Sequence, residues 1–422
     1  MNRVIIVGNG FDLAHNLKTK YENFINWYWD KWGQRLRSCG VKSISDGLCS
    51  FVLKDEVGLA GWYLVWSYHY GVYPANLTDR QLLEQAKKDD KVCDYKMHST
   101  FFSKICNSIE TKGWVDIEAD YYAMLVECKG KKDELERLNR DFAVIQALLI
   151  EYLTEIQELN INEELVCEEI KNAILSPVFK RDMAVSSIIE WWGFVEERLK
   201  AEDTELTKIL APYVDARYMH IVRKDIQDFA NKNYERIIVH GEEPLRWPDY
   251  FLVPDRVMLL NFNYTKTADL YLPKSTGFIC NHIHGNLLVP ETVIFGYGDE
   301  SDDEYKILQK FNDNEYLRHI KTNRYLETPN YRDLLSFIDS APFQVCIMGH
   351  SCGLSDKTLL NTLFEHKNCV SIKPYYYVNE QGKDNYLDIV QNISRNFTNP
   401  QLMRDRVVNK TFCSPLPQKA KE

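Results

Sequence analysis

The sequence lacks several features that would assign the chain to a class at once. Its 11 cysteines include no Cys-x-x-Cys pair, and the nearest two are Cys346 and Cys352. This spacing argues against a disulfide framework and against a zinc module, so we expect reduced thiols and no bound metal. No apolar run approaches the roughly 20 residues of a membrane span, and the first residues lack a signal-peptide pattern. We therefore expect a cytoplasmic protein without a membrane partner.

An excess of positive charge is also missing. The chain has 51 Lys and Arg against 61 Asp and Glu, a formal net charge of −10, which argues against extensive nucleic-acid binding. Hydrophobic residues make up 45% of the sequence and aromatic residues 13%, enough for a large core. A chain of 422 residues can form one large domain with an insertion, or two to three ordinary domains.

The first motif is a strand followed by a glycine-containing turn. Arg3–Val7 is rich in β-branched apolar residues, which is typical of a strand buried on both faces of a parallel sheet. Gly8 and Gly10 then permit a tight turn, whose backbone amides can approach a phosphate at the start of a helix. Asp12 can cap that helix or contact a ribose hydroxyl. Leu13 replaces the third glycine of the dinucleotide fingerprint, so a plain strand-to-helix turn is an equal alternative.

The middle of the chain is dominated by helical patterns. Residues 17–32 have helical spacing, and almost no clear strand is visible between about residues 51 and 231. Apolar residues from Leu135 to Leu159 recur in alternating steps of three and four, a heptad pattern that predicts a seam buried within the chain or across a dimer. Asp116 and Glu118 are interpreted as a solvated or capping pair in preference to a metal or acid–base site.

Strand patterns return in the last third, at residues 257–260, 278–283, 292–295, 343–348 and 370–378, with helices expected at 356–365 and 386–397. Several of these strands end in small or polar residues, as in doubly wound sheets that bind ligands beyond the carboxyl ends of their strands. We predict an α/β fold in which residues 1–32 and 250–400 form a Rossmann-like nucleotide-binding domain. Residues 33–249 are predicted to form an all-helical insertion, and residues 401–422 a C-terminal tail that is extended or mobile beyond Asn409.

One motif suggests a different chemistry. Gly349-His-Ser-Cys-Gly353 matches the Gly-x-Ser-x-Gly nucleophile elbow and stands between a predicted strand and a predicted helix. A hydrolase triad also needs a histidine downstream, and His366, the only one that follows, lies too close in sequence. A serine hydrolase that uses Ser351 is therefore a lesser alternative.

Taken together, the turns resemble a known family. Their order is that of sirtuin-like domains, and the chain more closely resembles the phage abortive-infection AbiH family over nearly its whole length. The matching residues are Gly8 to His15, Thr19, Tyr21, Trp114 to Glu118, Leu138 to Phe142, Leu260 to Thr265, His282 to Gly285, Phe295-Gly296, Gly349 to Ser351 and Asp356. The sirtuin zinc module is absent and Thr265 stands where an acid usually follows the Asn turn, so the resemblance does not extend to protein deacylation.

The resemblance implies a protein of phage defence that binds NAD and hydrolyses it to nicotinamide and ADP-ribose. It selects Asn263 and His284 as catalytic. The residues it implies in cofactor binding are Gly8, Asn9, Gly10, Phe11, Asp12, Gly285, Gly349, His350, Ser351 and Asp356. A non-catalytic nucleotide sensor and an interaction protein stay open as alternatives, as do a phage-derived trigger and a homo-oligomer formed through the helical insertion.

The chemistry of NAD cleavage suits these side chains. Cleavage passes through an oxocarbenium-like ribose, as in glycoside hydrolysis. Asn263 offers a donor and an acceptor to position water or ribose hydroxyls, and a histidine supplies a base near neutral pH. Strand alternation predicts that His282 and His284 share a face, so at most one of them needs to be catalytic.

Overall fold

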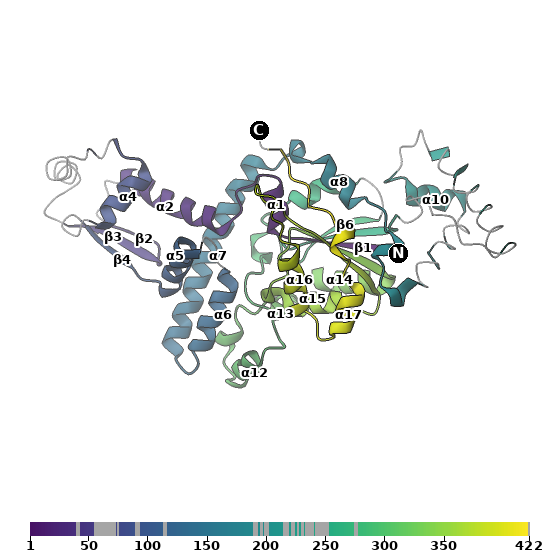
Figure 1. Cartoon of the computed structure of the whole chain (residues 1–422). Helices are drawn as coiled ribbons and strands as arrows, with labels where there is room; N and C mark the ends of the chain where they lie inside the picture. Colours follow the sequence, from purple (N-terminus) through teal and green to yellow (C-terminus); the bar gives the residue numbers. More distant parts are fainter. Residues whose placement is uncertain are drawn as a thin grey trace. The chain divides into compact units, whose positions relative to one another are not determined.

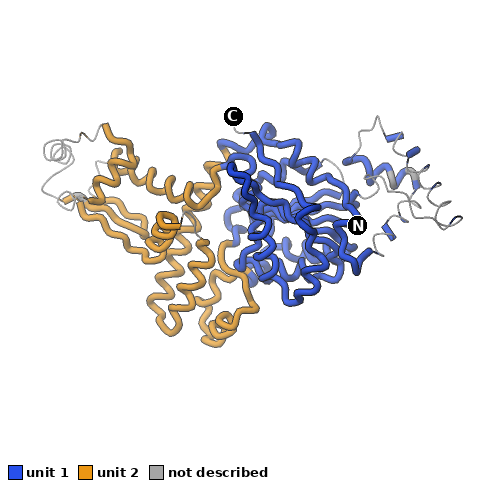
Figure 2. Tube along the Cα trace, in the orientation of Figure 1, with its two compact units in different colours: residues 1–17, 159–294, 322–422 blue, residues 18–158, 295–321 orange. Residues whose placement is uncertain are grey.

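The computed structural model describes residues 1–38, 43–54, 73, 76–88, 93–112, 116–188, 193–194, 197, 202–213, 219–220, 224–225, 228, 232, 240, 253–273 and 277–420. The chain divides into two compact units (Figure 2). Unit 1 comprises Met1–Leu17, Leu159–Ile294 and Thr322–Glu422, and unit 2 comprises Lys18–Glu158 and Phe295–Lys321. The predicted domain boundaries at residues 32 and 250 stay a prediction.

A parallel sheet forms the centre of unit 1 (Figure 1). Its five strands are β1 (Asn2–Val7), β5 (Arg256–Asn261), β6 (Phe278–His282), β7 (Phe343–Met348) and β8 (Cys369–Tyr375). All four pairings are parallel, and the strand order is β6-β5-β1-β7-β8. Counted along the chain this is the order 3-2-1-4-5 of a Rossmann-like sheet, which confirms the predicted α/β class. The order reverses between β1 and β7.

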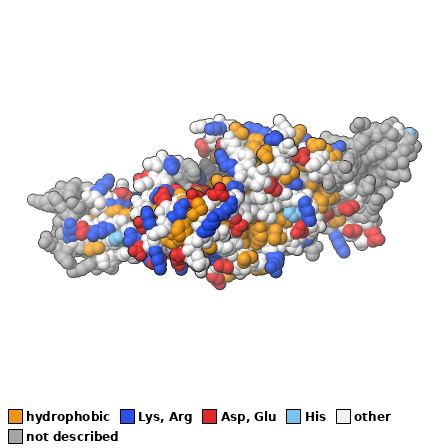
Figure 3. Space-filling view, turned by 90° about the horizontal axis from the view of Figure 1, so that it is seen from below, with side chains coloured by type: hydrophobic (Ala, Val, Ile, Leu, Met, Phe, Trp, Pro, Cys, Tyr) orange, Lys and Arg blue, Asp and Glu red, His pale blue; other side chains and the backbone are white. Residues whose placement is uncertain are grey.

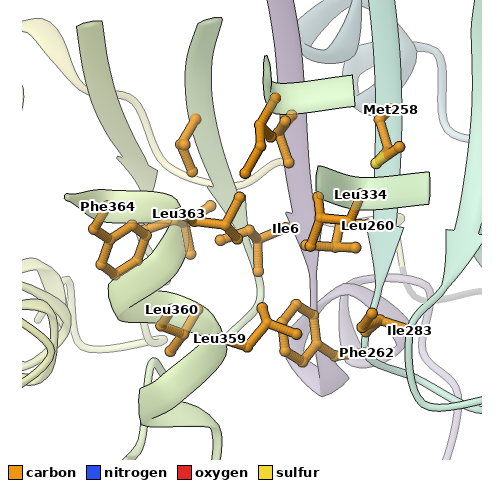
Figure 4. Packing of buried hydrophobic residues seen from close by; sticks show 14 of the residues in the cluster. Ile6, Met258, Leu260, Phe262, Ile283, Leu334, Leu359, Leu360, Leu363 and Phe364 are labelled. Atoms are coloured by element: carbon orange, nitrogen blue, oxygen red, sulfur yellow. The ribbon is translucent and has the colours of Figure 1, made fainter. Parts of the chain in front are cut away.

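Helices cover both faces of this sheet. In β1, Val4 and Ile6 belong to one apolar cluster while Ile5 and Val7 belong to the other, as strand alternation requires. The first cluster packs against α14 (Asn330–Ser340), α15 (Lys357–Phe364) and α16 (Tyr386–Arg395), partly shown in Figure 4. The second packs against α1 (Asn9–Ala14) and α8 (Glu168–Ile174). Among the described residues, unit 1 also contains α10 (Asp203–Leu210) and α17 (Pro400–Arg406), and α13 (Lys321–Arg324) crosses a unit boundary.

Unit 2 combines helices with a small antiparallel sheet. Its described α-helices are α2 (Tyr21–Ser38), α4 (Asp79–Lys88), α5 (Thr100–Lys112), α6 (Ile117–Glu127), nearly all of α7 (Lys132–Asn160) and α12 (Asp303–Lys310). Its strands, β2 (Ser43–Ser45), β3 (Cys49–Leu53) and β4 (Cys93–Met97), pair in the order β2-β3-β4. The prediction of an all-helical insertion over residues 33–249 is therefore wrong. Strands of three to five residues with polar exposed positions carry too little apolar alternation to be detected.

Two other predicted segments differ. Residues 292–295 do not form a strand: Pro290–Thr292 is a 3₁₀ turn, and the buried residues that follow it are irregular. The predicted C-terminal tail begins with α17, and beyond Asn409 the chain is largely without helix or strand and bonds to the rest of unit 1. There the Leu416 amide donates to the Tyr376 carbonyl at 2.8 Å, and the Lys419 amide donates to the Ala14 carbonyl at 2.8 Å. The sequence also shows an apolar stretch at residues 185–199 and a helical pattern at residues 215–231, and both lie mostly outside the described residues.

The heptad seam follows one face of α7. Leu135, Phe142 and Ile145 are fully buried, and Leu149 is 5% exposed. Leu159 is 80% exposed, so the seam ends before the last predicted position.

Among the described helices, none is long and apolar enough to cross a membrane. Acidic and basic side chains are interspersed on the face shown in Figure 3.

These exposures predict the effect of charge on α7. Leu149→Lys should lower the free energy of unfolding by about 2–5 kcal/mol from lost apolar packing, with a further cost for burying a charge. Leu159→Lys, on the same helix, is the matched control and should leave stability unchanged. Thermal melting and sedimentation of both variants test this, and equal behaviour of the two would contradict the buried seam.

Candidate functional site

Two turns at the carboxyl edge of the sheet pack backbone against backbone. Gly8 and Gly10 follow β1, and Gly349 follows β7. A Cβ added to Gly10 would lie 2.8 Å from the Gly349 Cα, and one added to Gly8 would lie 2.6 Å from the His350 Cα. Gly349 has φ +76°, and its Cβ would lie 2.0 Å from the Phe11 nitrogen. Only glycine fits this crossing, because any larger residue forces the turns apart.

Three backbone amides that the sequence suggested for phosphate binding are hydrogen-bonded within and between these turns. The Gly8 amide donates to the Met348 carbonyl at 3.2 Å, the Gly10 amide to the Gly349 carbonyl at 2.7 Å, and the Phe11 amide to the Gly8 carbonyl at 2.8 Å. The glycines therefore bring the turns together and do not present those three amides outward. Asn9 and Ser351 are exposed on these turns. Phosphate binding by residues 8–12 stays a prediction.

Beside the turns, two buried histidines share one carboxylate. Nε2 of His284 lies 3.3 Å from Oδ1 of Asp356, and Nε2 of His350 lies 3.5 Å from Oδ2. All three side chains are at most 9% exposed. The Tyr325 hydroxyl lies 3.1 Å from Nε2 of His284, and the two rings stack at an interplanar angle of 10°. The structure thus brings together three residues that the sequence suggested separately.

The hydrogen bonds define how protons are distributed in this cluster. Nδ1 of His350 accepts from the Cys352 amide at 3.0 Å, so a neutral His350 carries its proton on Nε2, facing Asp356. His284 also presents Nε2 to Asp356, and the carboxylate favours a proton there. A neutral His284 then has Nδ1 as its basic nitrogen. Asp356 orients both rings and stabilises either one when it becomes charged.

Asn263 links the turn after β5 to the turn after β1. Its Nδ2 donates to the Gly8 carbonyl at 3.0 Å, and its backbone amide donates to Oδ1 of Asn261 at 3.0 Å. Gly285 has φ +77°, and a Cβ there would lie 2.1 Å from the Thr292 carbonyl oxygen. A close backbone contact therefore explains this glycine, whatever room it also leaves for a substrate.

The carboxyl group of Asp12 is buried, which is unusual for an ionisable side chain. The side chain is 1% exposed, its Oδ2 accepts from the Thr265 hydroxyl at 2.7 Å, and its Oδ1 has no hydrogen-bond partner among the described residues. Burial raises the pKa of Asp12 to about 6, although the Thr265 hydroxyl and the nearby polar groups of Thr267 and Asn263 oppose the shift. Asp12 is thus partly protonated near pH 6 and charged at higher pH.

Sequence reasoning missed several residues of this region. Tyr325 carries no motif of its own, and the motif that contains Thr265 gives no sign that its hydroxyl bonds Asp12. His282 and His284 do not share a face, because β6 ends at His282 and the chain turns there. His282 instead meets Asp269, from the 3₁₀ helix η8 (Thr267–Tyr271), and Cys280. Only the pairing of Cys280 and His282, two residues apart on one strand, signals this cluster in the sequence.

The nucleophile elbow is not assembled. Ser351 is exposed, and the residue with the left-handed conformation is Cys352, at φ 56°. Among the described residues, no hydrogen bond joins the Ser351 hydroxyl to a histidine, and Nε2 of His366 faces Asp339 at 3.4 Å. The structure does not support Ser351 as a nucleophile.

Two further features lie within unit 2. A groove of about 400 Å³ between α2 and α7 is lined in part by Trp27, Lys31 and Glu155, which bond to one another. Asp116 caps α6 by accepting from the Ala119 amide at 3.0 Å, as expected. Glu118 is not solvated, since it bonds the buried Lys321 at 2.9 Å.

The sheet order and the polar cluster at its reversal point define a Rossmann-like α/β protein with a candidate site at the carboxyl edge. The model of the family described as bacteriophage abortive infection AbiH matches residues 4–377. The chain therefore belongs to the AbiH family, which connects it to abortive infection in defence against phages. Comparison with curated proteins gives no match, and comparison with solved structures gives none.

The raised pKa of Asp12 predicts a pH dependence. Because its folded pKa of about 6 exceeds the value of 3.8 for an ordinary carboxyl, the folded state binds the proton first. The stability that Asp12 contributes should therefore be lost as pH rises from about 4 to about 6. The contribution of Asp12 to the free energy of unfolding falls by about 3 kcal/mol in total over this range. Asp12→Asn removes this contribution. Urea unfolding between pH 4 and pH 8 measures the difference between wild type and variant.

That difference should change with pH for Asp12→Asn, because the variant has no titrating carboxyl at this position. The substitution can itself change stability by an amount that is the same at every pH. Such a constant offset does not affect the test, because only the change of the difference with pH is compared. Parallel profiles of wild type and Asp12→Asn would contradict the raised pKa.

Proposed function

We propose that this AbiH protein binds NAD at the carboxyl edge of its parallel sheet and hydrolyses it to nicotinamide and ADP-ribose. The observation that carries the proposal is the position of the His284–Asp356–His350 cluster beside the two turns at the reversal point of the sheet. Nucleotides characteristically bind there in doubly wound folds. A buried carboxylate that holds two histidines is also a common arrangement for moving protons.

The proposed reaction assigns one role to each group. Nicotinamide leaves as a neutral base, and water attacks C1′ of the oxocarbenium-like ribose. His284 accepts the proton of that water, and Asp356 stabilises the imidazolium that forms. Asn263, held by the Gly8 carbonyl, positions the water or a ribose hydroxyl. The products are nicotinamide, ADP-ribose and one proton, which His284 returns to solvent.

The phosphates are assigned to side chains, because the amides of Gly8 and Gly10 are already bonded. Asn9 and Ser351 are exposed on the two turns that meet at the reversal point, and both offer donors. In this proposal Gly8, Gly10 and Gly349 fix the distance between those two donors.

One observation favours a second candidate function. His284 is 4% exposed and Asp356 9% exposed, so a ribose reaches them only if neighbouring loops open. A non-catalytic sensor that binds a nucleotide at the surface needs no such opening. The two functions differ in turnover, which is directly measurable.

Turnover separates the two candidates. His284→Ala and Asn263→Ala should each lower nicotinamide release by ~10²–10⁴, the usual cost of losing a base or a water-positioning group, while NAD binding persists. His366→Ala is the matched control, because this histidine faces Asp339 rather than the cluster. Purified protein, taken from uninfected and from phage-infected cells, is incubated with NAD, and nicotinamide is followed by chromatography.

Release that persists in both site variants would remove these residues from the mechanism. Binding of NAD or ADP-ribose without release from either source would favour the sensor. Absence of both binding and release would contradict the proposal as a whole.

Ser351 is expected to act on affinity. A hydrogen bond to a charged phosphate contributes about 1.5–3 kcal/mol, so Ser351→Ala should weaken NAD binding about 10–100-fold and leave the rate at saturating NAD largely unchanged. Calorimetric titration of both proteins measures the affinity. Covalent labelling of wild type, but not of Ser351→Ala, by a serine-directed phosphonate would instead indicate a hydrolase.

A further inference from the structure

A thiol, an imidazole and a carboxylate converge on one point at the edge of the sheet. Cys280 and His282 lie two residues apart on β6, the edge strand, and Asp269 comes from η8. Nε2 of His282 lies 3.1 Å from Oδ2 of Asp269 and 3.6 Å from Sγ of Cys280. One ligand atom from each residue lies within 4.8 Å of both others. Among the described residues, this is the one group of such side chains close enough to share an ion.

Although the cysteine spacing led us to expect no bound metal, we propose that Asp269, Cys280 and His282 bind a zinc ion whose fourth position is taken by water. Zn²⁺ binds sulfur at about 2.3 Å and nitrogen or oxygen at about 2.0–2.2 Å in tetrahedral geometry. Those lengths place sulfur and nitrogen about 3.5 Å apart, and nitrogen and oxygen about 3.3 Å apart. The separations of 3.6 Å and 3.1 Å in this protein are close to both values. Small adjustments of the three side chains therefore bring them to coordination distances.

The composition of the cluster selects the kind of metal. A thiolate and an imidazole favour a borderline-soft cation such as Zn²⁺ over Mg²⁺ or Ca²⁺, which prefer oxygen ligands only. One thiolate and one carboxylate also balance the double charge of the ion. The side chains of His282 and Asp269 are 15% and 36% exposed, so an ion can enter from solvent.

The geometry is not that of a catalytic Cys–His–Asp triad. In a triad the nucleophile and the orienting acid contact opposite nitrogens of the imidazole. Here the sulfur and the carboxylate both contact Nε2 of His282, whereas Nδ1 lies 3.3 Å from Nδ2 of Asn261. Two groups facing the same nitrogen suit coordination of a shared ion better than a proton relay.

Binding the ion requires two proton movements. The Cys280 thiol releases its proton to solvent as it becomes a thiolate. His282 coordinates through Nε2, so its proton moves to Nδ1, where it faces the amide group of Asn261. The Asn261 side chain donates from Nδ2 to the Thr265 carbonyl at 3.0 Å, and its Oδ1 accepts from the Asn263 backbone amide at 3.0 Å. These two bonds prevent the amide group from flipping to present its oxygen to Nδ1. Asn261 therefore opposes the bound form, whereas a carboxylate there would favour it by accepting from Nδ1.

The experiment uses the full chain stripped with a chelator and titrated with Zn²⁺ against a competing dye, and with Co²⁺ as a spectroscopic probe. We expect one equivalent to bind and a thiolate-to-cobalt absorption band to form. Cys280→Ser should abolish that band and weaken Zn²⁺ binding by more than the 10–100-fold typical of outer-shell changes. Cys106→Ser, a buried cysteine of unit 2, is the matched control and should change neither.

A second variant tests the Asn261 argument. Asn261→Asp should tighten Zn²⁺ binding by about tenfold, because a carboxylate that accepts from Nδ1 orients the ring and raises its basicity. Circular dichroism of each variant verifies folding. Failure of the wild type to bind a stoichiometric ion would overturn the proposal, as would a cobalt band that survives in Cys280→Ser. Zinc binding is measured without NAD, so this test can fail while the proposed NAD hydrolysis stands, and the reverse.

Discussion

The close crossing of two backbone turns is the constraint on which the rest of the site depends. Gly10 and Gly349 approach so closely that no side chain fits between them, and the Gly10 amide donates to the Gly349 carbonyl at 2.7 Å. This contact holds the loop after β1 against the loop after β7, at the point where the strand order reverses. The positions of Asp12, His350 and Asp356 depend on it, since Asp12 lies in α1 directly after the first turn, His350 lies on the second, and Asp356 ends the 3₁₀ helix that follows it.

Ionisable side chains are buried around that crossing, although burial disfavours their charged forms. Asp356 is shared by two histidines, and Asp12 is buried with one oxygen lacking a partner among the described residues. Buried carboxylates lower stability unless they are fully compensated, and such costs are typically retained at functional sites. The cluster is therefore better explained by chemistry or ligand binding than by folding. Membership of the AbiH family supplies the biological setting, phage defence.

The sequence predicted the parallel sheet well because its signals are local. β1, β5 and β7 are apolar runs that end in glycine or asparagine, and such runs specify a buried strand whatever surrounds them. The short strands β2 and β4 of unit 2 have no such pattern, so an all-helical insertion was predicted wrongly. At the site, the motifs identified His284, His350 and Asp356, but their meeting depends on strand order. Tyr325, and Asp269 beside Cys280 and His282, reach their partners only through tertiary contacts, which spacing does not reveal.

The central claim is that a nucleotide binds where the loops after β1 and β7 meet. Hydrogen exchange of the purified chain, with and without saturating NAD or ADP-ribose, tests this most directly, because it locates the ligand whether or not turnover occurs. The account predicts slower exchange in residues 8–15, 263–267, 284–287 and 349–357, all in unit 1. Unchanged exchange in these segments, or protection confined to the groove between α2 and α7, would contradict it.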